Sequence, residues 1–324
     1  MAVSRSWRPT GSIDGPHRAG PQHIGELNEV FSAAFTDRYR RDGLSGVRVP
    51  FLNPAIWRYA IEDADDGAMI WRDERGNLAA FNMVHQSGAE GWMGPLAVRA
   101  DQQGRGLGKE VVLKGVEWLR ERGASVIGLE TMPRTVDNIG FYARLGFTPG
   151  HLTLTLTLDA ARHETQLDLL SRLGSGAKAQ ALEDCRALLA RVLPGSDYSR
   201  EITLTESLEL GDTMLLYDGG RLDGFALAHT APLVEGRTRD ELRVLKLVLA
   251  DERRFASLAY ALGDYAKRSG SRRVAIRMQG EYADAFRQLV TMGAHVRWSD
   301  LRLSLDGYRE RKPTQGMVLS NWEI

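Results

Sequence analysis

Apolar residues along the chain recur with two spacings, and the order of these spacings indicates a layered fold. Apolar residues three or four positions apart are typical of amphipathic helices, and strict alternation is typical of half-buried strands. In the first half, this pattern predicts helices at 26–40, 54–61, 109–122 and 136–145 and strands at 68–72, 78–85, 92–98, 126–131 and 152–158. We therefore expect an α/β unit whose mixed, mostly antiparallel, twisted sheet is flanked by helices.

A similar order of elements recurs in the second half. The pattern predicts a helix at 179–192, a hairpin within 213–230, a strand at 242–249, a helix at 255–268, a strand at 274–278, a helix at 282–292 and a last strand that ends at Leu305. The sequence thus predicts two tandem copies of one fold. We expect a flexible arm over 1–22, a first domain over 23–159, a linker over 160–178 and a second domain over 179–324. The strand-like tail 314–324 is expected to join one of the two sheets.

A glycine-rich loop between a predicted strand and a predicted helix is the most informative local feature. The apolar run 96–98 ends the strand, and glycines at 104, 106 and 108 precede the helical pattern. The first amides of a helix lack intrahelical partners and lie at the positive end of its dipole, so this arrangement favours a bound phosphate. The loop is not a P-loop, because Glu110 replaces the required hydroxyl residue. It is not a dinucleotide fingerprint either, because Lys109 stands three positions after Gly106.

Two motifs in the first half resemble those of a known family. The segment Gln103-x-x-Gly106-x-Gly108 resembles the acyl-coenzyme A loop of the GNAT superfamily of N-acetyltransferases. The segment 138–147, Asn-Ile-Gly-Phe-Tyr-Ala-Arg-Leu-Gly-Phe, resembles the later motif of that superfamily. The resemblance is strong over 26–159 and topological only over 179–306. Without it, the glycines are typical of a turn, and the aromatic residues of the second motif are typical of a core.

The resemblance implies an N-acetyltransferase that depends on acetyl-CoA and acts on a primary amine of a small molecule or peptide. It implies that the amine attacks the thioester directly in the first domain and that Tyr142 protonates the departing thiolate. The loop amides would bind pyrophosphate, and the backbone at 96–98 would pair with pantetheine. The residues expected to bind the cofactor are Leu96, Ala97, Val98, Gln103, Gly104, Arg105, Gly106, Leu107, Gly108, Lys109, Asn138, Phe141 and Tyr142. No metal is expected.

The sequence offers several candidates for the general base. Glu90 lies two residues before the predicted strand 92–98, on the same face as Trp92 if the strand extends so far, and Glu130 lies on the predicted strand 126–131. Either carboxylate can take a proton from an ammonium group through water. Each is more often a surface or ion-paired glutamate, and His85 at a strand end is a weaker candidate. Many members of the family need no strong base, because water carries the proton. Asn138 is as typical of a helix cap as of a cofactor contact.

The second copy lacks the residues on which this chemistry depends. Aligning the two copies places Ala256 opposite Gly106, Leu258 opposite Gly108 and Leu289 opposite Tyr142. Side chains at the loop positions would crowd a pyrophosphate held on backbone amides. We therefore expect a degenerate domain that buries part of the first copy and walls the acceptor pocket.

Composition narrows the partners and the compartment. The 324 residues include 42 basic and 42 acidic side chains, and a zero net charge without a basic tract gives no electrostatic footprint for nucleic acid or an anionic membrane. No apolar run is long enough for a membrane span, so we expect a cytoplasmic monomer or homodimer. The single cysteine, Cys185, excludes an intrachain disulfide and a thiolate metal cluster.

Two alternative functions follow from the same residues. One is a non-catalytic, regulatory acyl-CoA-binding protein, against which the intact loop glycines and Tyr142 argue. The other is a transferase that uses another acyl donor or a hydroxyl acceptor. In that case Trp92 and Met93, which the sequence places near the pocket, would set the length of the acyl chain.

Overall fold

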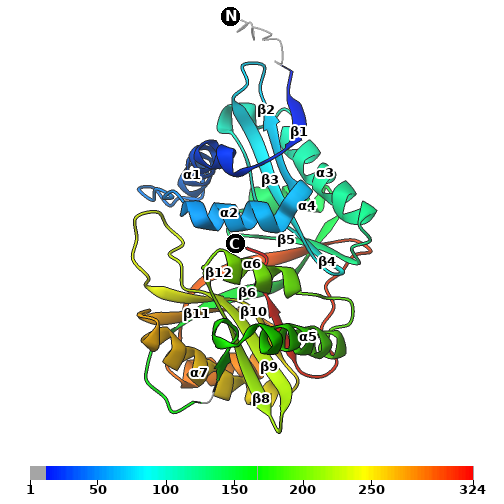
Figure 1. Cartoon of the computed structure of the whole chain (residues 1–324). Coiled ribbons are helices and arrows are strands. Elements are labelled where there is room, and N and C mark those ends of the chain that lie inside the picture. Colours follow the sequence, from blue (N-terminus) through cyan, green and yellow to red (C-terminus); the bar gives the residue numbers. More distant parts are fainter. Residues whose placement is uncertain (1–11, 166, 324) are drawn as a thin grey trace, which may run out of the picture.

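Helices and strands repeat in the same order in the two halves of the chain (Figure 1). The computed structural model describes residues 12–165 and 167–323. The first half consists of β1 (Asp14–Arg18), α1 (Ile24–Arg41), α2 (Pro54–Ala64), β2 (Ala68–Arg72), β3 (Leu78–Ser87), β4 (Glu90–Val98), α3 (Leu107–Glu121), β5 (Val126–Thr131), α4 (Val136–Ala143) and β6 (Phe147–Asp159). The second half consists of β7 (Asp168–Leu169), α5 (Ser175–Val192), α6 (Ser199–Ser207), β8 (Gly211–Asp218), β9 (Arg221–His229), β10 (Glu241–Leu249), α7 (Phe255–Arg268), β11 (Arg273–Gln279), α8 (Ala283–Thr291) and β12 (His295–Leu305). A further strand, β13 (Met317–Ser320), follows. The predicted repetition of one mixed α/β fold is therefore confirmed.

Three details differ from the sequence pattern. β1 lies within the arm expected over 1–22, and its mostly exposed side chains give no apolar alternation from which to predict a strand. It pairs with β2 at the edge of the sheet, while residues 1–11 of that arm lie outside the described residues. The short helix α6 was not predicted, and α5 begins at Ser175, inside the expected linker.

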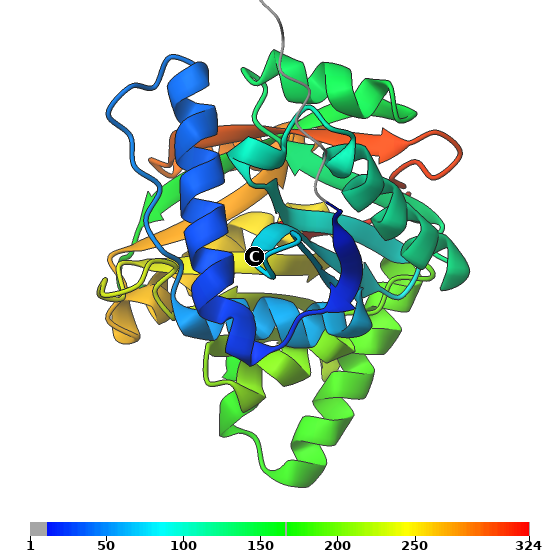
Figure 2. The same cartoon turned by 90° about the horizontal axis from the view of Figure 1, so that it is seen from above.

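In each half of the chain, a pair of helices covers either face of that half's part of the sheet. In the first half, α3 and α4 cover one face around Val111 and Tyr142, and α1 and α2 cover the other face around Leu27 and Trp57. Figure 2 shows α1 and α3 on opposite sides of this sheet. In the second half, α7 and α8 form one core with the sheet, and α5 and α6 form another. The repeat therefore extends to the packing of the helices.

The two halves share one continuous sheet because each inserts a strand into the other. The described strands follow the order β1-β2-β3-β4-β5-β12-β6-β11-β10-β9-β8-β7. The last strand of the second half, β12, thus lies between β5 and β6, and β6 of the first half lies between β12 and β11. β6 and β12 run side by side where the halves meet (Figure 1). The boundary expected at 159 coincides with the end of a strand that both halves use.

In each half, two neighbouring parallel strands diverge. β4 pairs with β5 only over 90–93, opposite 126–129, and then separates from it. β10 pairs with β11 only over 241–244, and beyond this point β13 pairs with β10 over 246–249. The tail of the chain therefore fills the gap in the second half, whereas no described strand fills the gap in the first half.

Candidate active site

The glycine-rich loop leaves a row of backbone amides without partners. Gly104 and Gly106 have φ angles of 75° and 93°, a left-handed conformation that favours glycine. From Gly104 to Lys109, no backbone N–H donates to a backbone carbonyl of the described residues. A Cβ at Gly104 or Gly106 would meet no atom within 4 Å, so packing does not require glycine there. The loop presents its amides at the positive end of the α3 dipole, where they can bind an anion such as a phosphate.

The free edge of β4 leads into this loop. The amide of Arg99 donates to the carbonyl of Ala79 at 2.9 Å, so the alternating antiparallel pattern turns the backbone groups of Leu96 and Val98 away from β3. β5 has already diverged on that side. Gln103 closes the loop end of the edge by donating from Nε2 to the Val98 carbonyl at 2.9 Å. An extended ligand with amide groups of its own can therefore pair with β4 as a strand would.

A cavity of about 440 Å³, here called the loop cavity, joins the loop to this free edge. Most of the predicted cofactor residues line it: Leu96, Ala97, Val98, Gln103, Gly104, Gly106, Gly108, Lys109, Asn138, Phe141 and Tyr142. Arg105 and Leu107 do not. The side chain of Arg105 is exposed, and that of Leu107 is buried in the core under α3. The structure thus brings the two sequence motifs to one site.

The opposite wall of the loop cavity comes from α1, which the sequence did not assign to this site. Phe35, Arg38 and Arg41 line the cavity, and their spacing of three residues puts them on one side of the helix. Arg38 pairs with Asp42, and Arg41 pairs with Asp37 at 2.6 Å. The sequence contained this stripe, but arginines on an amphipathic helix are equally typical of a solvated face.

Tyr142 lies where the loop cavity meets a second cavity. Its side chain is buried and packs edge-on against Phe141 and Phe147, with ring centroids 5.2 and 6.0 Å away. Burial raises the pKa of Tyr142, so the phenol keeps its proton at neutral pH. Tyr142 therefore offers a protonated hydroxyl where the two cavities meet.

Asn138 also borders both cavities. It lies inside the first turn of α4, and the N-cap position belongs to Thr135. Its Nδ2 donates to Thr131 Oγ1 at 3.4 Å, a long hydrogen bond. The cap interpretation of Asn138 is therefore wrong, and its amide faces the cavities.

The second cavity has a volume of about 300 Å³ and is called the aromatic cavity after its walls. Phe31, Phe35 and Tyr39 of α1 contribute rings from the first half, and Trp298 and Trp322 contribute rings from the second half. The two cavities have residues of α1, β4 and α4 in common, so they adjoin. Ligands in the two cavities would meet beside Tyr142.

Glu130 reaches the aromatic cavity, as expected for a candidate base, but it is held by two arginines. Its buried carboxylate accepts from Arg302 Nε at 2.8 Å and from Thr153 Oγ1 at 2.6 Å, and it also pairs with Arg277. Burial alone would raise the pKa of Glu130, but Arg277 and Arg302 lower it to about 2. A carboxylate this acidic is a weak proton acceptor, so the structure does not favour Glu130 as the base.

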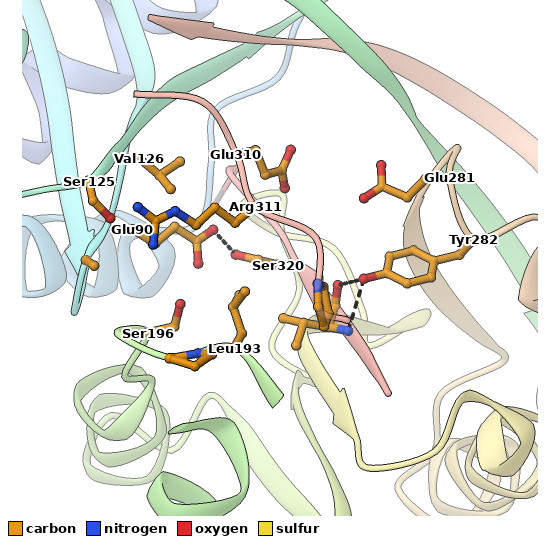
Figure 3. A pocket seen from close by; sticks show the side chains of 14 residues that line it. Glu90, Ser125, Val126, Leu193, Ser196, Glu281, Tyr282, Glu310, Arg311 and Ser320 are labelled. Carbon is orange, nitrogen blue, oxygen red and sulfur yellow. Dashed lines mark hydrogen bonds between the residues drawn. The ribbon is translucent and has the colours of Figure 1, made fainter. Parts of the chain in front are cut away.

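Glu90 lies outside both cavities, which corrects its prediction as a base. It is at the start of β4, and the strand places it about 26 Å from Val98. Its buried carboxylate accepts from Ser320 Oγ at 2.6 Å, from Tyr198 Oη at 3.0 Å and from Trp322 Nε1. Figure 3 shows Glu90 pointing at Ser320 of β13. Glu90 therefore anchors the tail of the chain to the first half.

His85 and Trp92 also lie away from the cavities. His85 is buried, stacks on Trp92 with ring centroids 4.0 Å apart, and bonds through Nδ1 to Asp63 at 2.6 Å. Trp92 packs against Trp322. Of the two residues expected to set acyl length, only Met93 lines the aromatic cavity.

The corresponding region of the second half has neither the loop nor the free edge. A short 3₁₀ helix at Glu252–Arg254 leads directly into α7, whereas residues 103–106 separate the equivalent turn at Ala100–Gln102 from α3. β13 occupies the gap beside β10. Tyr282 Oη donates to the Val318 carbonyl at 3.0 Å and accepts from the Val318 amide at 3.2 Å, which fixes the strand in place (Figure 3).

Residues 12–165 and 167–323 contain neither a membrane-spanning helix nor a cluster of metal ligands. No helix in these ranges combines the length and the apolar character that a membrane crossing requires. The same ranges contain no group of three or more histidine, cysteine, aspartate or glutamate residues arranged to hold a metal ion.

Comparison with known proteins agrees with this geometry. Residues 28–147 match the Acetyltransferase (GNAT) family. Among curated protein sequences, none matches the chain. A solved structure from Pyrococcus horikoshii, provisionally described as an acetyltransferase, has a TM-score of 0.68 at 15% identity and covers 99% of this chain and 98% of its own.

Two other solved structures have the same fold over almost the whole chain. A tandem GNAT protein from the clavulanic acid biosynthesis pathway has a TM-score of 0.60 at 11% identity and covers 93% of this chain and 100% of its own. Saccharomyces cerevisiae N-myristoyltransferase with bound myristoyl-CoA has a TM-score of 0.61 at 10% identity, and the match covers 96% and 81% of the two chains.

A diverging sheet, a loop of free amides and a buried tyrosine between two adjoining cavities define the class of the protein as an acyltransferase. Residues 28–147 form a GNAT acetyltransferase domain, and the chain as a whole has the same fold as a tandem GNAT protein.

Proposed function

We propose that this protein is an N-acetyltransferase that transfers the acetyl group of acetyl-CoA to a primary amine of a small molecule or peptide. The observation that carries the proposal is the position of Tyr142 between the loop cavity and the aromatic cavity. A donor in one cavity and an acceptor in the other would meet beside a protonated phenol. The catalytic unit is residues 23–159 completed by β12 and the tail from the second half.

The residues of the loop cavity fit the donor. The free amides from Gly104 to Lys109 would hold the pyrophosphate of acetyl-CoA, with the side chain of Lys109 beside them. The unpaired backbone of Leu96 and Val98 would hold the amide-bearing arm along β4. Bound acetyl-CoA supplies the thioester that the amine attacks.

The residues between the cavities fit the chemistry. An N–H on the free edge of β4, at Val98 or at Leu96, would stabilise the negative charge that develops on the carbonyl oxygen. Tyr142 would give its proton to the departing sulfur. The acceptor amine must lose a proton before it attacks, and water in the open part of the aromatic cavity can take it.

The experiment is isothermal titration of acetyl-CoA into the protein, followed by a thiol-release assay with a panel of primary amines. We expect one acetyl-CoA site per chain, and thiol release that requires an amine. Binding without turnover on any amine or alcohol would favour the regulatory alternative. Turnover only with alcohols, or only with longer acyl donors, would overturn the acceptor or the donor part of the proposal.

A further inference from the structure

One end of the aromatic cavity is built by the second half of the chain. β12 lies next to β5, with Leu301 opposite Thr131, and this pairing brings Asp300 to the cavity beside Glu130. Glu323, which follows β13, lines the same cavity. The first half alone would lack both of these carboxylates.

At this end of the cavity, carboxyl groups outnumber the guanidinium groups that they contact. Arg277 is shared by three carboxylates, because it pairs with Glu130, with Asp300 at 3.0 Å and with Glu323 at 2.9 Å. Arg302, the other guanidinium on Glu130, is also engaged by Glu310. Burial raises the pKa of Glu323 to about 8, and a bound cation would keep this carboxylate ionised, so the cluster favours a cation over an anion.

One carboxylate oxygen of Asp300 has an ion-pair contact but no hydrogen-bond donor. The residue is 2% exposed, and its Oδ1 accepts from Trp298 Nε1 at 3.1 Å. Its Oδ2 lies near Arg277 but has no partner with hydrogen-bond geometry. A buried carboxylate oxygen without a hydrogen bond is costly, so its position at a cavity points to a ligand that donates to it.

The remaining walls of the cavity are apolar rings. Phe31, Tyr39 and Trp298 face it, and Trp298 is 39% exposed. Aromatic faces attract cations as well as apolar surface, and they stack on flat groups. An acceptor that fits these walls has a ring or another apolar body behind its amine.

We propose that Asp300 binds the ammonium group of the acceptor, and that the acceptor is a primary amine on an aromatic or similarly apolar body without an acid group of its own. The inference rests on the proposed function and names the substrate class of that site. Asp300 is therefore a specificity-determining residue that the degenerate half supplies to the active half.

The experiment uses 2-phenylethylamine as the probe acceptor and phenylalanine as its acid-bearing counterpart. With wild-type protein, 2-phenylethylamine should be acetylated with a KM at least about tenfold below that of phenylalanine. The variant Asp300→Asn should raise the KM for 2-phenylethylamine at least about tenfold and leave the KM for acetyl-CoA unchanged. Asp300→Glu should restore most of the affinity because it restores the charge.

The matched control is Asp306→Asn. Asp306 immediately follows β12, accepts from Thr148 Oγ1 at 2.6 Å and lines neither cavity, so its loss should leave both KM values unchanged. Arg277 keeps Glu130 and Glu323 as partners in Asp300→Asn, and thermal melts would show that this variant folds.

An unchanged KM in Asp300→Asn, or an equal preference for phenylalanine, would overturn the inference while acetyl transfer to amines stands. Titration of 2-phenylethylamine into the CoA-saturated protein tests Asp300 independently of turnover. Absence of amine binding there would overturn the inference. Binding that weakens in Asp300→Asn would support it even if the wild-type protein transferred no acetyl group, a result that would count against the proposed function alone.

Discussion

The gap between diverging strands is open in the first half of this molecule and filled by a strand in the second half. Beside β4 it stays open and forms one side of the loop cavity, whereas beside β10 it is filled by β13. The residues of β10 that pair with β13, 246–249, correspond to residues 96–99 on β4. An unpaired strand edge needs a partner for its backbone groups, and the second half supplies that partner from its own chain.

The second half differs from the first at both parts of the predicted cofactor site. β13 and the Tyr282 hydroxyl occupy the place of a ligand arm, and α7 starts without a glycine loop. Because β13 already fills the gap beside β10, an extended ligand cannot lie there, and free amides at the start of α7 would have no pyrophosphate to bind. The strand that fills the gap also leads Trp322 and Glu323 to the aromatic cavity of the first half.

The largest effect, on acetyl-CoA affinity, is expected from a bulky side chain in the glycine-rich loop of the first half. Gly106→Val should lower the affinity for acetyl-CoA at least about a hundredfold, because valine disfavours a φ of 93° and places a side chain among the free amides. Gly123→Val is the matched control, since Gly123 has a φ of 73° and also has open space around it. Titration calorimetry and thermal melts measure both. Equal losses of affinity in the two variants would show that strain, and not the loop, is responsible.

A smaller effect is expected from the residue at the junction of the two cavities. Tyr142→Phe should keep acetyl-CoA binding and lower kcat about a hundredfold, because the sulfur loses its proton donor. Tyr260→Phe is the control, since Tyr260 is exposed on α7 in the equivalent region of the second half. Steady-state kinetics and direct titration separate kcat from binding. Unchanged turnover under conditions in which chemistry limits the rate would assign the proton to another group.

The smallest effect, on stability, is expected from removing the charge of Glu90, which anchors β13 in the gap beside β10. Burial would raise the pKa of Glu90, but Lys246 and the donors Ser320 and Trp322 outweigh it and hold the pKa below 4.5. Ionised Glu90 therefore stabilises the fold above about pH 4.5, and this contribution is lost as the pH falls through its lowered folded-state pKa. Glu90→Gln should cost about 2 kcal/mol at neutral pH.

Denaturant unfolding at about pH 7 and about pH 3 measures this effect. The difference in free energy of unfolding between wild type and Glu90→Gln should be smaller at the lower pH. The number of acetyl-CoA sites should stay at one, because the second half lacks the loop even when its gap is loosened. A difference in free energy of unfolding that does not depend on pH would contradict the assigned charge of Glu90. A second acetyl-CoA site would contradict the degeneracy of the second half.

Local features of the site were predictable from the sequence because each depends on residues that lie close together in the chain. The glycines at 104 and 106, the free strand edge at 96–98 and Tyr142 each belong to a motif of about ten residues, and the structure brings these motifs to one cavity. Glu90 was misplaced because alternation fixes the face of a strand but not which end of it reaches the site.

Features that depend on pairing between distant segments were not predictable. The alternation at 152–158 identified a strand, yet nothing in it names β11 and β12 as its neighbours, because many registers bury the same leucines. Asp300 was missed for the same reason, since only the insertion of β12 beside β5 brings it to the cavity. The arginines of α1 were visible as a stripe, but the sequence did not show what they face.

The exchange of β6 and β12 also has an evolutionary consequence. The second half lacks the glycine-rich loop and the open gap of the first half, yet it supplies a strand to the sheet of the first half and side chains to the aromatic cavity. Under the proposed function, selection on acetyl transfer in the first half therefore also acts on residues of the second half. Under the proposed function, substitutions in β12 (His295–Leu305) can change the acceptor while the glycine-rich loop before α3, which lies far earlier in the chain, is inherited unaltered.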